Sequence, residues 1–342
     1  MLRSEIAACR SDEHMIQAED YPSAMYEISR LGPVFGAEVH GMDLGSELSG
    51  EQFAFVREAL ITHEVLKLKD QNITAEQQLA FGRRFGKLLV SPFSPNADEA
   101  PELIVLDTHR HGRKPLTDIW HSDETYRPEP PFVTILRACI VPELGGDTMF
   151  ASMRAAYERL SDRMKTLISG LTAYHDFGRF DQLFSGDADR RKMLHEVELA
   201  LPHPNHPVVR LHPETGRKVL FVNRHFTTRI NELPDDEGRA ILEFLLGRTG
   251  VAETQLRVSW EPNTVVLWDN RSVQHYAPYD YYPQRRRMER VTVAGAAPLA
   301  DIESCSVAVP RMEVEGVPDQ PPGLPEPASS PARPFERQGS GR

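Results

Sequence analysis

Short apolar runs separated by turn-forming residues dominate the pattern of the chain from about residue 100 onward. The runs are 102–106, 132–138, 147–150, 208–212, 218–222, 255–260, 264–268 and 289–294. Their length and their β-branched content are typical of strands, and the turn at 213–216 predicts a hairpin. Earlier strands are expected at 37–39 and 65–68. Many short strands of this kind predict a sandwich or jelly-roll barrel.

Helical patterns with capping signals interrupt these strands. Ser49 precedes Gln52 by three residues, and Thr74 precedes Gln77 by three, which is the spacing of a capping box. The predicted helices cover residues 49–63, 74–86, 152–170 and 235–247. The first two are expected to pack on the outside of a β core. We therefore expect a mainly β fold with flanking α-helices.

Three segments lack this patterning and set the expected domain boundaries. Residues 1–28 are polar and are expected to form a poorly ordered extension. The segment 178–207 is long, charged and weakly patterned, as in lids or disordered loops, and we favour a lid. Residues 310–342 are rich in proline and lack periodicity, which predicts a disordered tail. The folded domain is expected to span residues 29–300.

The composition limits the possible partners. The 342-residue chain carries 39 basic and 50 acidic residues, a formal net charge of −11, which argues against nucleic acid and anionic membranes as partners. No apolar run is long enough to span a bilayer, and no signal peptide is evident in residues 1–10. The three cysteines are far apart and odd in number, which is typical of reduced thiols. We expect a cytoplasmic protein that acts on a small molecule.

His121 and Asp123 are the first candidates for chemistry. On an extended strand, side chains two residues apart point to the same face, so an imidazole and a carboxylate would lie side by side. Two imidazoles and one carboxylate are the ligand set of non-haem Fe(II) oxygenases, and His275 is the candidate for the third ligand. The alternative for His121 and Asp123 is a surface turn or a satisfied polar pair.

A basic run, 285–287, follows His275 along the chain. If this segment leads into a strand, Arg286 and Arg290 share one face of that strand. A guanidinium binds a carboxylate or a sulfonate through a bidentate fork, which suits a dicarboxylate co-substrate at a metal. The alternative is a solvated basic run, as is common for three adjacent arginines.

Five motifs occur in a recognisable order along the chain. They are His121-x-Asp123, Gly145-Gly146-Asp147-Thr148, Phe221-Val222-Asn223, Trp268-Asp269-Asn270-Arg271, and Gln274-His275-Tyr276 followed by Arg286 and Arg290. This set resembles the Fe(II)/2-oxoglutarate-dependent taurine dioxygenase (TauD/TfdA) family, which also contains 2,4-dichlorophenoxyacetate and alkylsulfate dioxygenases. The resemblance runs from about residue 32 to about residue 296. It implies a double-stranded β-helix, or jelly-roll, core with flanking helices.

The resemblance also implies a metal site and a co-substrate site. Fe(II) would be held by His121, Asp123 and His275, with 2-oxoglutarate and O2 as co-substrates. Thr148 and Arg286 match the positions that bind the distal carboxylate of 2-oxoglutarate. The implied reaction decarboxylates 2-oxoglutarate to succinate and hydroxylates a C–H bond of the substrate.

Two further positions match the substrate pocket of the family. Arg290 matches the position that grips the anionic head of the substrate, and Phe226 aligns with a position near the substrate. When the hydroxylated carbon carries a sulfonate, or an ether or ester oxygen, the product would fall apart and release sulfite, phenol or sulfate.

The sequence departs from the taurine enzymes where those bind the amine end of their substrate. Taurine enzymes use a histidine and a tyrosine after the second helix and an asparagine before the metal-ligand pair. The matching segments here contain Ser91, Ser94 and Thr117, which are smaller. We therefore expect a bulkier or more apolar anion than taurine. A sulfonate or sulfate ester is favoured, and an aryloxy acid is the alternative.

Two other function classes compete with a dioxygenase. A zinc hydrolase could use the same three ligands, but it has no use for Arg286 and Thr148 as a 2-oxoglutarate site. A non-catalytic jelly-roll binding protein has no use for a complete metal triad. We expect a homo-oligomer, either a dimer or a tetramer. Three other polar residues are expected to have structural roles: His225 as an ordinary polar histidine, and Asn223 and Asn270 as braces of turns.

Overall fold

The computed structural model describes residues 26–94, 96–111, 117–177 and 186–301. The expected proline-rich tail, 310–342, and nearly all of the expected N-terminal extension, 1–28, lie outside these residues. So does the stretch 178–185 of the insertion that we expected to be a lid. The disorder expected for the two ends therefore stays a prediction.

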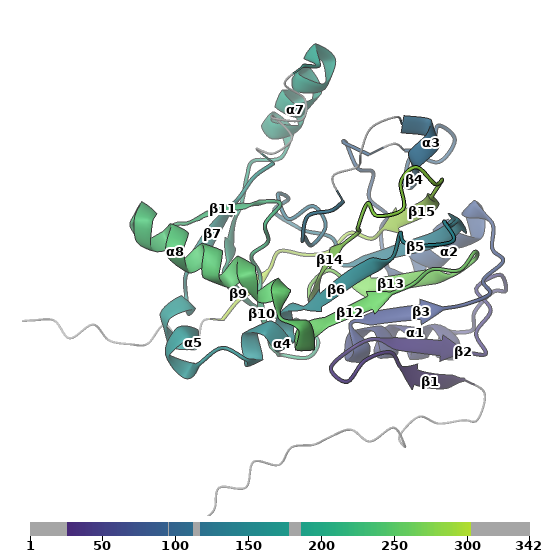
Figure 1. The fold of residues 1–342 in the computed structure, drawn as a ribbon, viewed down its shortest axis with the longest axis horizontal. Coiled ribbons are helices and arrows are strands. Elements are labelled where there is room, and N and C mark those ends of the chain that lie inside the picture. The colour runs from purple at the N-terminus through teal and green to yellow at the C-terminus, as the bar shows by residue number, and fades with distance from the viewer. Residues whose placement is uncertain (1–25, 95, 112–116, 178–185, 302–342) are drawn as a thin grey trace, which may run out of the picture. The chain divides into compact units, whose positions relative to one another are not determined.

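A large sheet forms one layer of the structure (Figure 1). Its strands, in spatial order, are β1 (Glu27–Arg30), β2 (Ala37–His40), β3 (Val65–Leu68), β13 (Val265–Asp269), β5 (Val133–Ile140), β15 (Arg287–Thr292) and β4 (Leu103–Asp107). Strands β2 and β3 are parallel, and the other neighbouring pairs are antiparallel. Strand β1 was not predicted and begins at Glu27, inside the segment expected to be an extension.

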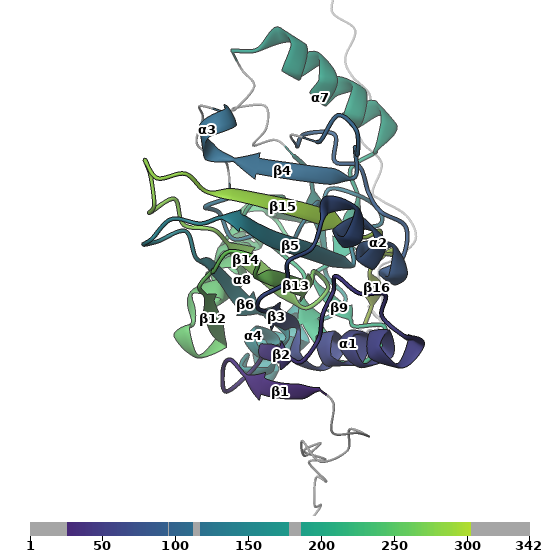
Figure 2. The same cartoon turned by 90° about the vertical axis from the view of Figure 1, so that its right-hand side faces the viewer.

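A small sheet packs against one face of the large sheet (Figures 1 and 2). Its strands are β12 (Gln255–Val258), β6 (Thr148–Ser152) and β14 (Val273–Tyr276), in that order. Phe150 and Val273 of the small sheet share a buried apolar cluster with Trp268 and Met288 of the large sheet. Two facing sheets with a common core are the jelly-roll arrangement that was predicted.

The two faces of the large sheet follow from the alternation of side chains along its strands. Val266 and Trp268 of β13 point toward the small sheet, whereas Val265 and Leu267 point to the opposite side. The same alternation holds on β15, where Met288 faces inward. Arg290, two residues further on, therefore also faces the interval between the sheets. Strand β15 begins at Arg287, so Arg286 lies just before it and not on the strand face predicted for both arginines.

Helices α1 (Gly50–His63) and α2 (Ala75–Phe85) cover the outer face of the large sheet. Both begin with the predicted capping box, in which Ser49 and Thr74 accept hydrogen bonds from the backbone of Gln52 and Gln77. The apolar side chains of both helices pack on β3, β5, β13 and β15. The sequence predicted the bounds and the scaffold role of these helices correctly.

Two further three-stranded sheets complete the described β structure. Their spatial orders are β10 (Lys218–Leu220), β9 (Val209–Leu211) and β16 (Leu299–Ala300), and β11 (Thr227–Ile230), β7 (Thr172–His175) and β8 (Asn205–Pro207). Strands β9 and β10 form the hairpin predicted around 213–216. Helix α8 (Asp235–Leu246) packs on this part of the core, close to its predicted bounds.

The remaining helices differ from the sequence prediction. The single helix expected over 152–170 is two helices, α4 (Met153–Glu158) and α5 (Asp162–Ile168). The break occurs because Ser161 caps a new helix by accepting a hydrogen bond from the backbone of Met164 (3.3 Å). Part of the insertion forms α7 (Ala188–Ala200), and α3 (Thr108–His111) follows β4. Among the described residues, no helix is long and apolar enough to cross a membrane.

Candidate metal centre and co-substrate pocket

His121 and His275 lie side by side at the β14 edge of the small sheet. The backbone N–H of His121 donates to the carbonyl of His275 (3.1 Å), and that of His275 donates to the carbonyl of His121 (2.8 Å). His275 belongs to β14, whereas His121 forms only an isolated bridge to it. The rings of Phe150 and Trp268 pack against His275, with centroids 6.2 and 4.7 Å away. The sheet register therefore brings together two histidines that are far apart in sequence.

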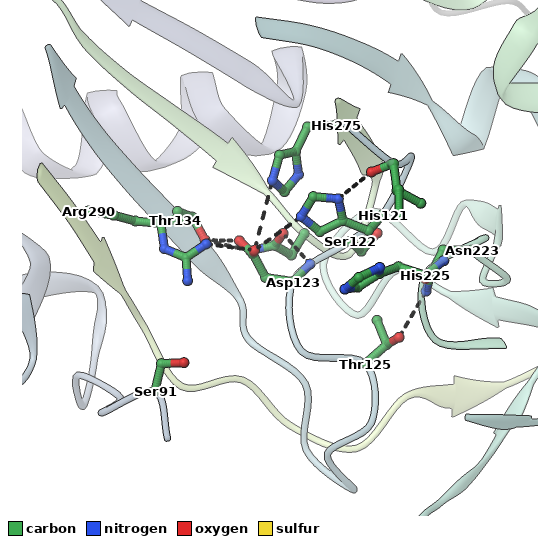
Figure 3. Close-up of polar contacts among 12 residues, drawn as sticks. Ser91, His121, Ser122, Asp123, Thr125, Thr134, Asn223, His225, His275 and Arg290 are labelled. Atoms are coloured by element: carbon green, nitrogen blue, oxygen red, sulfur yellow. Dashed lines mark hydrogen bonds and ion pairs between the residues drawn. The ribbon is translucent and has the colours of Figure 1, made fainter. Parts of the chain in front are cut away.

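Asp123 completes the triad, although the strand geometry predicted for it is wrong. The chain turns immediately after His121, at 123–126, and Glu124 has a left-handed φ of 43°. The turn nevertheless carries the carboxylate toward both imidazoles (Figure 3). Asp123 Oδ1 lies 3.9 Å from His121 Nε2 and 3.8 Å from His275 Nε2. The three ligand atoms lie within 4.8 Å of one another, and all three residues are buried.

The protonation states of the triad fit a metal site. His121 Nδ1 donates to the Ile119 carbonyl (2.6 Å), which leaves Nε2 as the lone-pair nitrogen facing Asp123. Burial lowers the pKa of both imidazoles, so both are neutral. Burial alone would raise the pKa of Asp123, but the neighbouring Arg290 charge and the hydrogen bond from Thr134 hold the pKa below its ordinary value. An ionised carboxylate with two neutral imidazoles is the donor set of a non-haem Fe(II) site.

Arg290 lies directly beside the carboxylate of the triad. Its Nη1 donates to Asp123 Oδ1 (3.1 Å). Its Nε is buried and has no hydrogen-bond partner among the described residues. The structure thus brings the predicted anion-binding arginine next to the metal ligands, with part of its donor capacity unused.

Arg286 is buried immediately before the start of β15. Its side chain packs between the rings of Trp260 and Tyr281, whose centroids lie 5.9 and 5.8 Å from the guanidinium carbon. Its Nε donates to the Gly146 carbonyl (3.0 Å), whereas its Nη2 is buried with no partner in the described part of the chain. Burial lowers the pKa of Arg286 to about 10, so the group stays charged at neutral pH. A buried cation with an unused donor is suited to bind an anion.

Thr148 lies in the same pocket as Arg286. Its hydroxyl oxygen accepts a hydrogen bond from Trp260 Nε1 (3.1 Å), and Trp260 is also the ring beside Arg286. A hydroxyl that accepts still has its own hydrogen to donate. The prediction that Thr148 and Arg286 act together is therefore consistent with their placement.

The turn before Thr148 favours glycine because Gly146 has a left-handed backbone conformation and lies close to Pro142 and Arg286. Gly146 has a φ of +72°, and a Cβ at this position would lie 3.2 Å from Arg286 Cδ. The loop 277–284 holds the turn from the other side, since Asp280 Oδ1 accepts a hydrogen bond from the Gly146 N–H (2.8 Å). Arg257 pairs with both Asp147 (2.6 Å) and Asp280 (3.4 Å). This turn and this loop are therefore fixed to each other beside Arg286.

Sequence reasoning missed the roles of Trp260, Asp280 and Tyr281 in this pocket. No spacing rule links Trp260 to Arg286, because β12 and the loop 277–284 are separated in sequence and come together only in the folded chain. The run 279–282, with three tyrosines next to the basic run, was the one local signal of an aromatic surface here.

Phe226 belongs to a buried aromatic cluster near the triad. Its ring lies 5.3 Å from Tyr126, and Phe93 and Phe177 complete the cluster. Leu194 of α7 packs on the same rings, so the described part of the insertion packs on this cluster. A lid role for the whole insertion stays a prediction.

Three small polar residues, Ser91, Ser94 and Thr117, stand at the positions that match the amine-binding side chains of taurine enzymes, and their surroundings differ. Ser91 is buried, and its hydroxyl accepts a hydrogen bond from Ser94 (3.0 Å). Figure 3 shows Ser91 apart from the triad. The carbonyl of Thr117 accepts a hydrogen bond from the Ala277 N–H (2.8 Å), which places Thr117 just beyond β14. Contact of these residues with substrate stays a prediction.

His225 lies at the site, although it was expected to be an ordinary polar histidine. Its ring centroid is 5.5 Å from that of His121. Asn223 holds it there, because Asn223 Oδ1 accepts hydrogen bonds from the backbone of His225 (3.1 Å) and Phe226 (2.9 Å). The brace expected of Asn223 is confirmed, and what it braces is the segment facing the triad.

Comparisons with known proteins agree with this geometry. The sequence profile of the family described as "Taurine catabolism dioxygenase TauD, TfdA family" matches residues 27–292. The chain is 34% identical to an alkylsulfatase of Acinetobacter baylyi, over 80% of this chain and 86% of that protein. It is 33% identical to an (S)-phenoxypropionate/alpha-ketoglutarate-dioxygenase of Sphingobium herbicidovorans, over 80% of this chain and 96% of that protein. The crystal structure of a taurine dioxygenase from Burkholderia xenovorans is similar with a TM-score of 0.69 and 31% identity, covering 81% of this chain and 94% of that one.

Proposed function

The chain belongs to the TauD/TfdA dioxygenase family, and on that premise we propose that it hydroxylates a small organic anion, with a sulfate ester or a sulfonate as the favoured substrate. It is an oxidoreductase that depends on Fe(II), 2-oxoglutarate and O2. Its reaction converts 2-oxoglutarate and O2 to succinate and CO2 while one oxygen atom enters a C–H bond of the substrate.

His121, Asp123 and His275 would hold the iron, which supplies the redox chemistry that couples decarboxylation of 2-oxoglutarate to hydroxylation. The contribution of the chain is to hold the reactants in place. Two neutral imidazoles and one carboxylate occupy one side of the site and leave the other side for co-substrate and substrate. The buried rings of Phe150 and Trp268 exclude water behind His275.

The buried Arg286 is the observation that most favours a 2-oxoglutarate enzyme. Its Nη2 has no partner among the described residues, and the Thr148 hydroxyl shares its pocket. The two groups match a terminal carboxylate, which can accept from both. A zinc hydrolase with the same ligands binds no 2-oxoglutarate, so the buried Arg286 guanidinium would have no carboxylate to pair with.

Arg290 is the residue proposed to bind the anionic head of the substrate. It lies 3.1 Å from Asp123 Oδ1 and retains a buried Nε donor. The aromatic cluster that includes Phe226 would face the body of the substrate. Its apolar surface favours an alkyl or aryl body over the ammonium group of taurine.

Sulfate esters are favoured within this class because the chain resembles both an alkylsulfatase and a sulfate ester dioxygenase. Hydroxylation of the carbon that bears the ester oxygen gives a product that collapses to an aldehyde and inorganic sulfate. An aryloxyalkanoate substrate is the second candidate, because the chain is similar to phenoxypropionate and dichlorophenoxyacetate dioxygenases to a comparable degree. The cytoplasmic location and the homo-oligomeric state inferred from the sequence remain part of this proposal.

A matched substrate panel tests the proposed function. Taurine, a linear alkyl sulfonate, an alkyl sulfate and an aryloxyacetate would be assayed for succinate formation with the wild type and with Arg290→Ala. We expect the alkyl sulfate or alkyl sulfonate to give the highest kcat/KM, and we expect Arg290→Ala to reduce it strongly. If taurine is the best substrate, or if Arg290→Ala leaves the rate on the preferred anion unchanged, the assigned pocket is wrong.

A further inference from the structure

We propose that Thr134 and Asn270 are positioning residues that present a single oxygen of Asp123 to the metal. This inference rests on the proposed function, since it assumes that Asp123 is a metal ligand. Within the described chain, no hydrogen bond joins either residue to the two imidazoles of the triad. Thr134 contacts the carboxylate of Asp123 (Figure 3), and Asn270 contacts Thr134 and the backbone of Asp123.

Four hydrogen bonds connect these residues in a closed buried network. Thr134 Oγ1 donates to Asp123 Oδ2 (2.6 Å), and Asn270 Nδ2 donates to Thr134 Oγ1 (2.9 Å). Asn270 Oδ1 accepts from the backbone N–H of Asp123 (3.2 Å) and from Trp268 Nε1 (3.1 Å). All four residues are at most 3% exposed, so water does not compete for these groups.

The donor and acceptor roles in this network follow from chemistry. The indole N–H of Trp268 and the backbone N–H of Asp123 can only donate, so the amide oxygen of Asn270 must face them. The amide nitrogen of Asn270 then faces Thr134 and can only donate to it. The single hydroxyl hydrogen of Thr134 is thereby directed to Asp123 Oδ2.

The two oxygens of Asp123 consequently have different roles. Oδ2 is engaged by the Thr134 hydroxyl, whereas Oδ1 faces both imidazole Nε2 atoms and Arg290. The network thus opposes rotation of the carboxylate and disfavours binding of a metal through both oxygens. Such orientation matters here because Asp123 lies in a turn, with no ladder hydrogen bonds to hold it in register.

The network also gives a physical reason for the run Trp268-Asp269-Asn270. Trp268 is anchored in the core between the two sheets, with its ring 5.5 Å from Phe150. Its indole nitrogen fixes the amide of Asn270, and Asn270 fixes the turn that carries Asp123. Asn270 was expected only to brace a turn, and the turn that it braces is the one with the metal ligand.

The test measures Mn(II) affinity of the full-length protein, with free Mn(II) followed by electron paramagnetic resonance. Thr134→Val removes the hydroxyl at constant shape, and we expect it to weaken Mn(II) binding about 10- to 100-fold, as for other groups that orient a ligand. Thr134→Ser restores the hydroxyl and should return the affinity to within about threefold of wild type. Asn270→Ala is the second variant and should also weaken binding.

Thr292→Val is the matched control. Thr292 is buried, lies opposite Thr134 in the register of β15 and β5, and its hydroxyl has no hydrogen-bond partner in the described chain. The Mn(II) affinity of the Thr292→Val variant should equal that of wild type. In the double variant Thr134→Val, Asn270→Ala, the loss should not exceed the larger single loss, because both residues act through one carboxylate.

Asp123→Ala separates failure of this inference from failure of the proposed function. If Asp123→Ala abolishes Mn(II) binding while folded Thr134→Val and Asn270→Ala bind as wild type, the positioning role is wrong and the metal site stands. If Thr134→Val and Thr292→Val weaken binding equally, the effect reflects general damage to the core and the inference also fails. If Asp123→Ala leaves Mn(II) affinity unchanged, the metal assignment itself is wrong.

Discussion

Replacement of Arg286 by glutamine tests the co-substrate pocket most sharply. Arg286 is 7% exposed, lies between Trp260 and Tyr281, and stays charged because its pKa is lowered only to about 10. Glutamine keeps hydrogen-bonding groups, but it loses the positive charge and the two-pronged geometry of the guanidinium. Loss of one partner of a desolvated charge pair costs about 2–5 kcal/mol. At about 1.4 kcal/mol for each factor of ten, the affinity should fall at least about thirtyfold.

The assay is calorimetric titration of the Mn(II)-loaded protein with N-oxalylglycine, a non-reacting analogue with the same distal carboxylate as 2-oxoglutarate. Oxalate, which lacks that distal carboxylate, is the matched ligand control and should bind wild type and Arg286→Gln equally. The matched protein control is Arg285→Gln. Arg285 is 43% exposed and is paired with Asp107 (2.6 Å), so its replacement should leave N-oxalylglycine affinity unchanged.

An unchanged affinity of Arg286→Gln for N-oxalylglycine would refute this assignment of the pocket. An equal loss for oxalate would show that the substitution disturbs the metal centre instead of the distal carboxylate. A large loss in Arg285→Gln would transfer the role to a neighbouring arginine and would contradict the outward pairing of Arg285 with Asp107.

Three other changes should have measurable effects. Asp123→Ala removes the one carboxylate of the triad, so Fe(II)-dependent turnover should be nearly abolished while the circular dichroism spectrum stays that of wild type; wild-type turnover would contradict the triad. Asp280→Ala removes the acceptor of the Gly146 N–H, so the KM for 2-oxoglutarate should rise about fivefold. Asp280→Asn keeps an acceptor, so its KM should rise less. Burial lowers the pKa of His206 to about 4 from 6.5, so the unfolded state binds more protons in this interval and the free energy of unfolding should fall by about 3 kcal/mol between pH 6.5 and 4. Denaturant titrations of His206→Gln at several pH values should show a smaller decrease in the free energy of unfolding between pH 6.5 and 4. An unchanged dependence of this free energy on pH would contradict the assignment to His206.

Local signals predicted much of the fold. The serine and threonine caps of α1 and α2, each with a glutamine three residues later, gave the helix bounds closely. The apolar runs that became β5, β13 and β15 are buried on both faces, which is why their pattern was clear in the sequence. The predictions failed where a local alternative competed, as at Ser161, whose side chain starts a new helix inside the expected one.

The sequence identified the residues of the metal site correctly, but it did not predict how the backbone brings them together. His121, Asp123 and His275 do converge, but Asp123 does so through a turn and not through the alternation of a strand. Contacts between distant segments, such as Asp280 with Gly146 and Asn270 with Asp123, depend on sheet register and loop packing. Neither is encoded by the spacing of residues in one stretch of chain.

The most direct test of the proposed reaction is its stoichiometry with an alkyl sulfate. Succinate and inorganic sulfate would be measured together in reactions with Fe(II) and O2, with and without 2-oxoglutarate. A dioxygenase with the pocket described here should form one succinate for each sulfate released and should release no sulfate when 2-oxoglutarate is omitted. Release of sulfate without 2-oxoglutarate would instead indicate a hydrolase that uses the same His121, Asp123 and His275 ligands, and it would contradict the proposed function.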